Sequence, residues 1–500
     1  MIHRLAPCVL AACALATAAH SQTTWYVNDD TCPATGSGTL ADPFCDVQVA
    51  MNAAAPGDTI LVYGGNYGAL DYLGKDVVVK SLQGSAVTAL GPVRFVSAEG
   101  SGAVLDGFEV QLPTPMGHAL ECMGSSPVIT NCLFRNIFAS SVGPAIYISS
   151  GGTPRFVRNV IKNNIQLPDQ GRGGAVYVEG SSPEFDGNLF LNNDVFADFG
   201  GGYGGAIYIT ASSPVVLRNN LFSANSCSDE SLNKGGAIYA IGSTLTLEGN
   251  TFTGNLAADG QSILGQPGTP GRGGAMYLQS CTTDAVNQIL WADIATEGQE
   301  LYIQGGSFTV SYSDVEGGQA GVGGTGTLTW SLGMVDVFPL IQGPEFHLSP
   351  NSPLVDQGLP TTNSLAGQTD GDVDPRVLDG DGDGIPVSDM GWDEFNRTTL
   401  GVAGTGTLGT QLTYTTDGAV GQGYVLLGST GTGFFQHKKF GAILIDLSFA
   451  PQLGSGLVPG VDIATVPLDP TLVGLTVYAQ ALAFDATAGS FSRRVATTLR

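Results

Sequence analysis

The sequence predicts an all-β protein whose main part is a right-handed parallel β-helix, with an N-terminal helical cap and a small C-terminal β domain. Three sequence motifs predict this architecture, because they recur about every 30 residues in one cyclic order. The composition agrees, since 72 glycines and 26 prolines among 500 residues, with only 13% charged residues, are typical of a loop-rich β protein. We expect a signal peptide at residues 1–21, the β-helix at 22–340, an acidic Asp-rich closing region at 341–397 and the C-terminal β domain at 398–500.

The first motif is Asn-x-apolar-x-x-Asn, whose copies start 28, 29, 32 and 30 residues apart. The copies begin at Asn131, Asn159, Asn188, Asn220 and Asn250. An asparagine at the same corner of every coil can hydrogen-bond to its neighbours above and below, as in the side-chain ladders of stacked strands. The apolar residues of the motif are expected to form an interior column of Leu133, Ile161, Phe190, Phe222 and Phe252.

The second motif is a Gly-rich corner followed by an alternating segment, as in GGAIYI, and Ser-Ser-Pro interleaves with it as a third motif. Glycine permits the tight corner, and the alternation predicts a short strand with two distinct faces. The copies of the second motif begin at Gly117, Gly143, Gly173, Gly204, Gly235 and Gly273. Stacking the coils places one apolar residue of each copy in an interior column: Leu120, Ile146, Val176, Ile207, Ile238 and Met276.

The same alternation places a tyrosine of each coil on the outer face. These residues are Tyr147, Tyr177, Tyr208, Tyr239 and Tyr277, and we expect Tyr302 to continue the column. Rungs about 4.8 Å apart match the length of a sugar unit, so the column is a candidate site for an extended glycan. The alternative is an aromatic ladder that stabilises the sheet.

Four residues that immediately precede the Gly-rich motif form a second candidate ligand-binding set: Arg172, Tyr203, Lys234 and Arg272. They follow insertions that project from one side of successive coils, and such insertions map to the binding face of repeat proteins. The alternative is local ion pairing between these bases and the acids of the insertions.

The closing region contains the strongest metal signal. Nine carboxylates lie between Asp370 and Glu394, against the single base Arg376. Asp379, Asp381 and Asp383 alternate with glycine, as in the opening of a calcium loop. Position 12 of that loop is Met390 rather than glutamate. Calcium is therefore the predicted cofactor, with Asp389 and Asp393 completing the shell, and a solvated acidic turn is the alternative.

The N-terminus predicts export. Basic residues precede an apolar run from Leu5 to Ala19, and small residues before Gln22 offer a cleavage site. A lipoprotein box ending at Cys13 is the competing interpretation. In an exported chain we expect a disulfide between Cys32 and Cys45, which flank a short loop. The pairing of the other four cysteines stays open: Cys122, Cys132, Cys227 and Cys281.

An open β-helix exposes strand edges and core at its ends, so both ends need covers. Residues 44–55 have helical character, and Pro56-Gly57 follows as a stop signal. We therefore expect an N-terminal helical cap.

These repeats resemble those of polymorphic outer-membrane proteins and, more widely, the pectate-lyase-like superfamily of right-handed β-helices. Residues 348–358 (LSPNSPLVDQG), with the acidic segment after them, resemble the choice-of-anchor-Q region of bacterial surface β-helices. Residues 401–500 are similar to a C-terminal β domain of secreted planctomycete-type proteins. The resemblance implies an architecture and a surface location, whereas fold does not fix activity.

The function that we expect is binding or adhesion by a secreted or cell-surface β-helix, with a polysaccharide or cell-envelope glycan as the partner. A polysaccharide lyase or glycoside hydrolase acting on the β-helix face is the alternative, and a structural spacer is the third possibility; no residue is assigned as catalytic. The formal net charge of -25 argues against nucleic acid and anionic membranes as partners. After the N-terminal run, no stretch is long and apolar enough to span a bilayer.

Overall fold

The computed structural model describes residues 22–499 with several gaps. The gaps are 168–170, 197–200, 229–231, 261–267, 344–345, 361–367, 372–373, 381–384, 397–398, 409, 418–422, 431, 438–440, 446–451, 458–459, 469–474, 485–488 and 493–494. The predicted signal peptide (1–21) and two of the predicted calcium ligands, Asp381 and Asp383, therefore lie outside the described residues.

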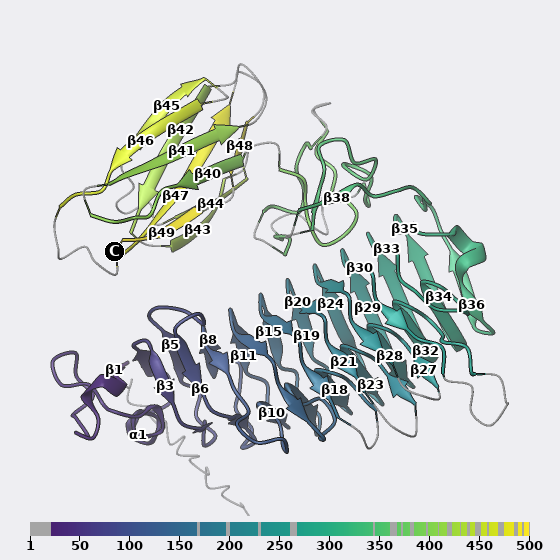
Figure 1. Ribbon diagram of the computed structural model, residues 1–500, viewed down its shortest axis with the longest axis horizontal. Helices are drawn as coiled ribbons and strands as arrows, with labels where there is room; N and C mark the ends of the chain where they lie inside the picture. Colours follow the sequence, from purple (N-terminus) through teal and green to yellow (C-terminus); the bar gives the residue numbers. More distant parts are fainter. Residues whose placement is uncertain are drawn as a thin grey trace, which may run out of the picture.

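The main body is a right-handed parallel β-helix, and its strands stack coil upon coil (Figure 1). We call the row of strands that carries the tyrosines row A. It contains β4 (Leu70–Asp71), β7 (Val93–Phe95), β10 (Leu120–Met123), β14 (Ile146–Ser149), β18 (Val176–Glu179), β23 (Ile207–Thr210), β28 (Ile238–Ile241), the first halves of β32 (Met276–Val286) and β34 (Leu301–Ser311), and β36 (Gly323–Gly324).

Row B follows row A in each coil and shares β32 and β34 with it. It contains β1 (Thr24–Val27), β2 (Thr59–Val62), β5 (Val78–Ser81), β8 (Val104–Asp106), β11 (Val128–Thr130), β15 (Arg155–Val157), β19 (Glu184–Asp186), β24 (Val215–Arg218), β29 (Thr244–Glu248), the second halves of β32 and β34, and β37 (Thr327–Trp330).

Row C forms the third face of the coil, and short pieces complete it. Row C contains β3 (Gly65–Tyr67), β6 (Thr88–Leu90), β9 (Glu109–Val110), β12 (Leu133–Arg135), β16 (Val160–Lys162), β20 (Leu189–Leu191), β25 (Leu221–Ser223), β30 (Thr251–Thr253), β33 (Ile289–Trp291) and β35 (Asp314–Val315). The short pieces are β13 (Phe138–Ala139), β17 (Ile165–Gln166), β21 (Asp194–Val195), β26 (Ser226–Cys227) and β31 (Leu256–Ala257), together with β22 (Gly202–Tyr203) and β27 (Asn233–Lys234).

The interior of the coils is the main hydrophobic core. The predicted column from Leu120 to Met276 is confirmed, because each of its members is paired in register with the next and is buried. The row C column is confirmed from Ile161 onward, with stacked rings of Phe190, Phe222 and Phe252. Its first member was predicted wrongly: Phe134, not Leu133, pairs with Ile161 and is fully buried.

Two buried asparagine ladders run along row C. Asn159, Asn188, Asn220 and Asn250 form the first, and Asn164, Asn193, Asn225 and Asn255 form the second. In each step the side-chain amide donates to the side-chain oxygen of the next asparagine at 2.9–3.0 Å. It also donates to a backbone carbonyl of the preceding coil, as Asn188 does to Phe156 O at 2.8 Å. The predicted hydrogen bonds above and below each corner are therefore present.

The first motif copy, which begins at Asn131, is displaced from these ladders by one residue. The amide of Cys132 donates to Asn159 Oδ1, so Cys132 occupies the ladder position and this coil spans 27 residues instead of 28. Asn131 and Asn136 instead adopt positive φ angles of 54° and 55° at the turns, which asparagine tolerates better than most residues.

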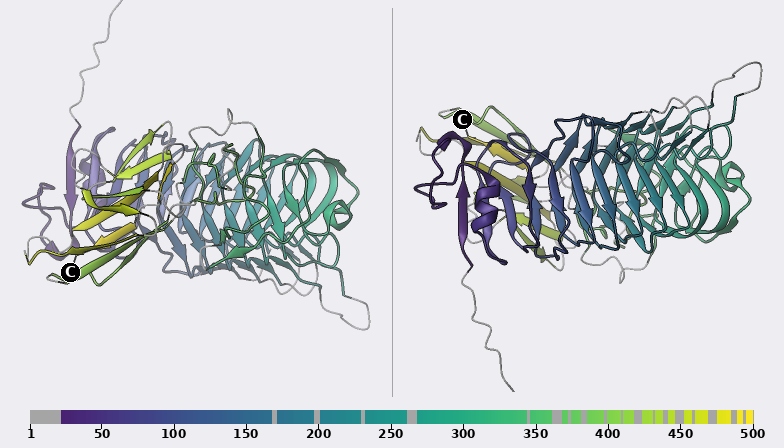
Figure 2. Two further views of the ribbon diagram at one scale, coloured as in Figure 1. Left: turned by 90° about the horizontal axis from the view of Figure 1, so that it is seen from above. Right: turned by 90° about the horizontal axis from the view of Figure 1, so that it is seen from below.

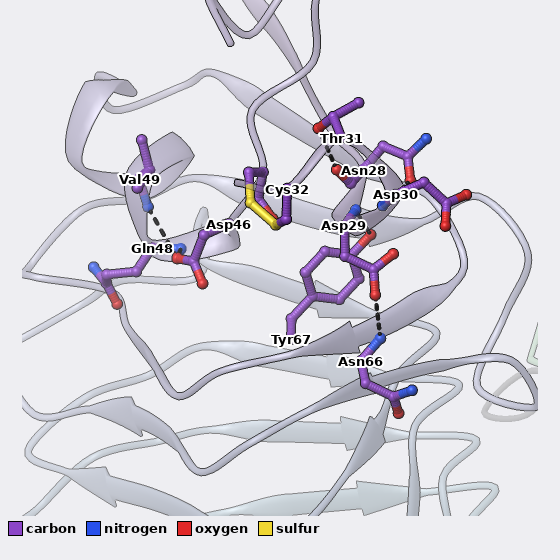
Figure 3. The surroundings of a disulfide bond; sticks show 11 residues. Asn28, Asp29, Asp30, Thr31, Cys32, Asp46, Gln48, Val49, Asn66 and Tyr67 are labelled. Atoms are coloured by element: carbon purple, nitrogen blue, oxygen red, sulfur yellow. Dashed lines mark hydrogen bonds between the residues drawn. A yellow bond between two sulfur atoms is a disulfide. The ribbon is translucent and has the colours of Figure 1, made fainter. Parts of the chain in front are cut away.

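The N-terminal cap is confirmed. Helix α1 (Val47–Ala53) begins after Asp46, whose carboxylate accepts the amides of Gln48 and Val49 at 2.8 and 3.3 Å (Figure 3). Its apolar side covers the first coil, where Val47, Ala50 and Met51 are buried.

The predicted disulfide joins Cys32 to Cys45 beside this cap, after the 3-10 turn η1 (Asp29–Thr31) (Figure 3). Asp29 connects the turn to the next coil by accepting the amide of Asn66 at 2.8 Å. The remaining four cysteines of the described chain, Cys122, Cys132, Cys227 and Cys281, are all buried.

After the last coil, which contains η2 (Gly318–Gly321), the chain turns back along the solenoid. The closing region, with the hairpin β38 (Ile341–Gln342) and β39 (His347–Leu348), lies beside row C (Figure 1). Asn219 donates its side-chain amide to Thr369 O at 2.9 Å, and Asn287 donates to Ser388 Oγ at 3.0 Å. The closing region thus runs along the side of several coils as a return strap.

The C-terminal domain is an antiparallel β structure beside the first half of the solenoid (Figures 1 and 2). Its strands are β40 (Thr399–Ala403), β41 (Gln411–Asp417), β42 (Gly423–Ser429), β43 (Thr432–His437), β44 (Gly441–Ile445), β45 (Gln452–Leu457), β46 (Gly460–Thr465), β47 (Thr476–Phe484), β48 (Gly489–Phe491) and β49 (Val495–Thr498). It has a core of its own, which includes Leu412, Tyr414, Tyr424 and Leu426.

Candidate functional site

The tyrosines of row A form a continuous stack on the outer face of the coils. Consecutive rings from Tyr147 to Tyr302 have centroids 5.1–5.6 Å apart and interplanar angles of 1–13°. The predicted outward orientation agrees with the structure, because the aliphatic residues on either side of each tyrosine belong to the interior core. The column is nevertheless buried: Tyr177, Tyr208, Tyr239, Tyr277 and Tyr302 expose only 2–9% of their surface.

This geometry bears on how a glycan could use the column. Each inner ring has a tyrosine on both faces, and Tyr147 stacks on Tyr177 and on His118, whose ring lies 4.5 Å away. A sugar therefore cannot stack on these faces, and the aromatic-ladder interpretation fits the packing better. His118 was missed by sequence reasoning, since its coil has Glu121 in the tyrosine position.

The residues that precede the Gly-rich corners form a second column beside the tyrosines. Their backbones pair in parallel from one coil to the next. Arg172 pairs with Tyr203, Tyr203 with Lys234, Lys234 with Arg272, and Arg272 with Glu297. The corner that sets this register requires glycine, because Gly204 has a φ of +70° and a Cβ there would clash with Ile207 O. The structure therefore brings together the four residues that sequence reasoning grouped by their position alone.

Each cation of this column lies over the tyrosine of the following coil. Arg172 Cζ is 5.6 Å from the ring centroid of Tyr208, and Arg272 Cζ is 5.3 Å from that of Tyr302. Lys234 Nζ is 4.8 Å from the centroid of Tyr277. These distances are within the range of cation–π attraction. We call Arg172, Lys234 and Arg272, with the rings beneath them, the cation column.

The cations differ in their ion pairing. Arg272 donates to Glu297 at 2.7 Å, whereas neither Arg172 nor Lys234 forms an ion pair in the part of the chain that the structure describes. Burial, and to a lesser extent the charge of Arg272, lowers the pKa of Lys234. Burial raises the pKa of Tyr177, Tyr208, Tyr239 and Tyr277, so these phenols stay neutral. Among the acids of the insertions, Asp169, Asp198, Asp229 and Glu230 lie outside the described residues. Asp194 and Asp259 are described, and they accept hydrogen bonds from the hydroxyls of Ser226 and Thr296.

The acidic segment of the return strap uses its carboxylates internally. Asp389 accepts the amides of Asp356 and Phe395, both at 2.6 Å. Asp393 accepts the amide of Leu348 at 2.9 Å, and a ring nitrogen of His347 lies 2.9 Å from its other oxygen. Both carboxylates are buried, so they stabilise the turns of the strap.

Arg376 occupies the centre of this segment and is almost completely buried. Its guanidinium donates to the carbonyls of Gly391 and Asp389 at 3.0 and 3.1 Å and lies 3.8 Å from a carboxylate oxygen of Glu394. Burial raises the pKa of Asp389 and of Glu394 well above the ordinary values. Sequence reasoning took Arg376 only as the one base among nine acids, because a linear pattern does not show which group enters the interior.

The described residues contain no group of three or more histidine, cysteine or acidic side chains arranged to hold a metal ion. Of the predicted calcium ligands, the described ones are Asp379, which is half-buried, and the internally bonded Asp389 and Asp393. The calcium hypothesis consequently depends on Asp381 and Asp383, of which the structure describes nothing.

Sequence reasoning also missed a buried acid pair, Asp293 and Glu300, at the end of the second asparagine ladder. A signal existed: the segment Gln288–Asp293 has the spacing of the first motif with glutamine and aspartate in place of both asparagines.

Residues 100–289 match the family described as right handed beta helix region. No curated protein and no solved structure matches the chain. The family match and the parallel rows agree on the fold, and neither specifies a ligand. The described part of the chain also has no helix with the length and apolar character that crossing a bilayer requires.

Proposed function

We propose that this protein is an exported binding module whose cation column holds an acidic polysaccharide along the axis of the β-helix. The observation that supports this proposal is the alignment of Arg172, Lys234 and Arg272 in a chain of formal net charge -25. Two of these three cations lack an ion pair among the described residues, although acids outnumber bases in the sequence by 44 to 19. Such a line of positive charge suits a ligand that repeats a carboxylate or a sulfate along its length.

The packing beneath the cations favours binding by a preorganised surface. The rings of Tyr208, Tyr277 and Tyr302 belong to a continuous stack, and each contacts the charged group of one cation, so the cations lose little conformational freedom when a ligand binds. Rungs about 4.8 Å apart let successive sugar units follow successive coils. In this proposal the buried tyrosines support the cations, and the ligand contacts the cations.

Export and display at a cell surface are part of the proposal. The basic residues followed by the apolar run from Leu5 to Ala19 support export, and the Cys32–Cys45 disulfide fits an oxidising compartment. The resemblance of the repeats and of the return strap to bacterial surface β-helices supports display.

Binding can be tested with polygalacturonate and with the same polymer fully methyl-esterified, which removes the negative charges and keeps the sugar backbone. We expect calorimetry to show binding to the first polymer only. The variant Arg172→Gln with Lys234→Gln should weaken it at least tenfold, since two charge-assisted contacts are lost at roughly 1.5–3 kcal/mol each. Arg155→Gln is the matched control, because Arg155 is ion-paired to Glu184 on row B.

Four results would contradict the proposal. Equal affinity for both polymers, or full affinity of the double variant, removes the role of the cation column. Absence of binding to any acidic or neutral polysaccharide favours the structural spacer. The appearance of shortened or unsaturated products in the same incubations favours the lyase or hydrolase alternative.

A further inference from the structure

The second asparagine ladder ends on a carboxylate. Asn164, Asn193 and Asn225 each donate to the next asparagine, and the last member, Asn255, has Asp293 as its partner. The backbone amide and the side-chain amide of Asn255 both donate to Asp293 Oδ1 at 2.7 Å. Asp293 thus occupies a ladder position without being able to donate as an asparagine does.

A second buried carboxyl group faces Asp293. Glu300 is fully buried, and the backbone amide of Asp293 donates to its Oε1 at 3.3 Å. Asp293 Oδ2 and Glu300 Oε2 are both buried, and neither oxygen has a hydrogen-bond partner. Ionised carboxylates have only acceptors, so two of them buried next to each other repel and cannot satisfy one another. A proton on one of the two groups supplies the missing donor.

The neighbouring charges increase the proton affinity of Asp293 and Glu300. Glu316, which accepts the amide of Ala292 at 2.8 Å, is the acid whose charge acts on both members. No basic side chain forms an ion pair with either member among the described residues, and the nearby Arg272 is paired with Glu297. A doubly ionised pair would therefore be buried beside a third negative charge.

The first ladder provides an internal comparison, because it ends on a neutral residue. Asn250 donates to Gln288 Oε1 at 3.1 Å, and Gln288 in turn donates its own amide to Val286 O at 2.6 Å. That ladder terminates without a titratable group, so a proton is needed at the end of the second ladder only.

We propose that Asp293 and Glu300 share a proton and act as a pH-operated latch on the coil that carries Glu297 and Tyr302. These two residues belong to the end of the cation column, since Glu297 pairs with Arg272 and the ring of Tyr302 lies under the same guanidinium. When the shared proton is lost, this coil opens, and Arg272 loses its contacts with Glu297 and Tyr302. The latch connects the pH of the surroundings to the charge that the column presents.

The direction of the effect follows from the raised pKa values. Burial raises the pKa of Asp293 to about 7 against the opposing effect of the neighbouring Glu300, while burial and the charge of Asp293 raise that of Glu300 to about 12. In the open coil both acids ionise near pH 4. The closed coil therefore holds more protons than the open one above that pH, so its stability is complete in acid and declines as the pH rises through 7 and beyond.

The test is hydrogen–deuterium exchange of peptides that cover residues 293–303 in the full chain, corrected for the intrinsic pH dependence of exchange. At least one proton is released on opening throughout pH 5.5 to 8.5, so the opening constant should rise at least about tenfold per pH unit over this range. We expect the full rise in the wild-type protein and a clearly smaller one in Glu300→Gln and in Asp293→Asn, where only one acid remains and an amide donates in place of the shared proton. Asp284→Asn, an exposed acid on β32, should keep the rise and is the control.

Infrared spectroscopy keeps the proposal testable if the variants fail to fold. The wild-type protein should show the absorption of a protonated carboxyl group at pH 8. Absence of that absorption, no rise in exchange with pH in the wild-type protein, or an equal rise in wild type and both variants would overturn the proposal.

Discussion

Removing one member of an asparagine ladder should destabilise the β-helix far more than a change at the exposed position beside it. In Asn188→Ala, the backbone amide of Asn159 loses its acceptor at 2.9 Å, and Phe156 O loses a donor at 2.8 Å. The side-chain amide of Asn159 keeps its bond to Ile129 O. Two buried groups lose a partner at roughly 1–3 kcal/mol each, so we expect the free energy of unfolding to fall by about 2–6 kcal/mol.

The measurement is urea denaturation followed by far-ultraviolet circular dichroism. Asn192→Gly is the matched control: Asn192 is exposed, immediately precedes the ladder residue Asn193 and has a φ of 52°, which glycine adopts without strain. We expect the control to change stability by less than about 0.5 kcal/mol. A loss of similar size in both variants, or a loss below about 0.5 kcal/mol in Asn188→Ala, would refute the idea that the ladder hydrogen bonds stabilise the coils.

Three further predictions concern other parts of the chain. Tyr208→Ala removes a ring that is stacked on both faces, so we expect a loss of about 3–5 kcal/mol in the same denaturation assay; a loss below about 1 kcal/mol contradicts a structural role for the column. Reduction of the Cys32–Cys45 disulfide, which closes a loop with a sequence separation of 13, should destabilise the cap by about 3 kcal/mol, seen as faster amide exchange in α1, and unchanged exchange contradicts this. Chelation should lower the melting temperature, and Asp381→Asn with Asp383→Asn should remove that effect, whereas superimposable curves with chelator and with millimolar calcium contradict a metal at these residues.

The features that repeat in every coil were predictable from the sequence. A residue such as Ile207 has one counterpart per coil, and register makes all of them interior if one is interior. The failure at Leu133 and Asn131 shows the limit of that reasoning: one coil is shorter by one residue, and the motif matched equally well at the displaced position. Strand register decides between such alternatives, and it depends on contacts with the next coil.

The features that occur once were much harder to predict. The alternation at Tyr208 gives its outward direction but not its burial, because the cover comes from the tyrosine rings of both neighbouring coils and from Arg172. Arg376 and the pair of Asp293 and Glu300 have charged side chains in the interior, where average burial tendencies place them outside. Only the three-dimensional surroundings show which charge has a partner.

The return strap limits how this fold can vary in length. A solenoid generally tolerates the gain or loss of a coil, because each coil contacts only its neighbours. Here the strap is fixed at Asn219 through Thr369 and at Asn287 through Ser388, so a coil inserted between those corners would separate anchors that a strap of given length must reach together. A coil inserted before β19 would leave the distance between these two anchors unchanged. Related chains of different length are therefore expected to gain or lose coils near the N-terminal end and to keep the number between β24 and β33 constant.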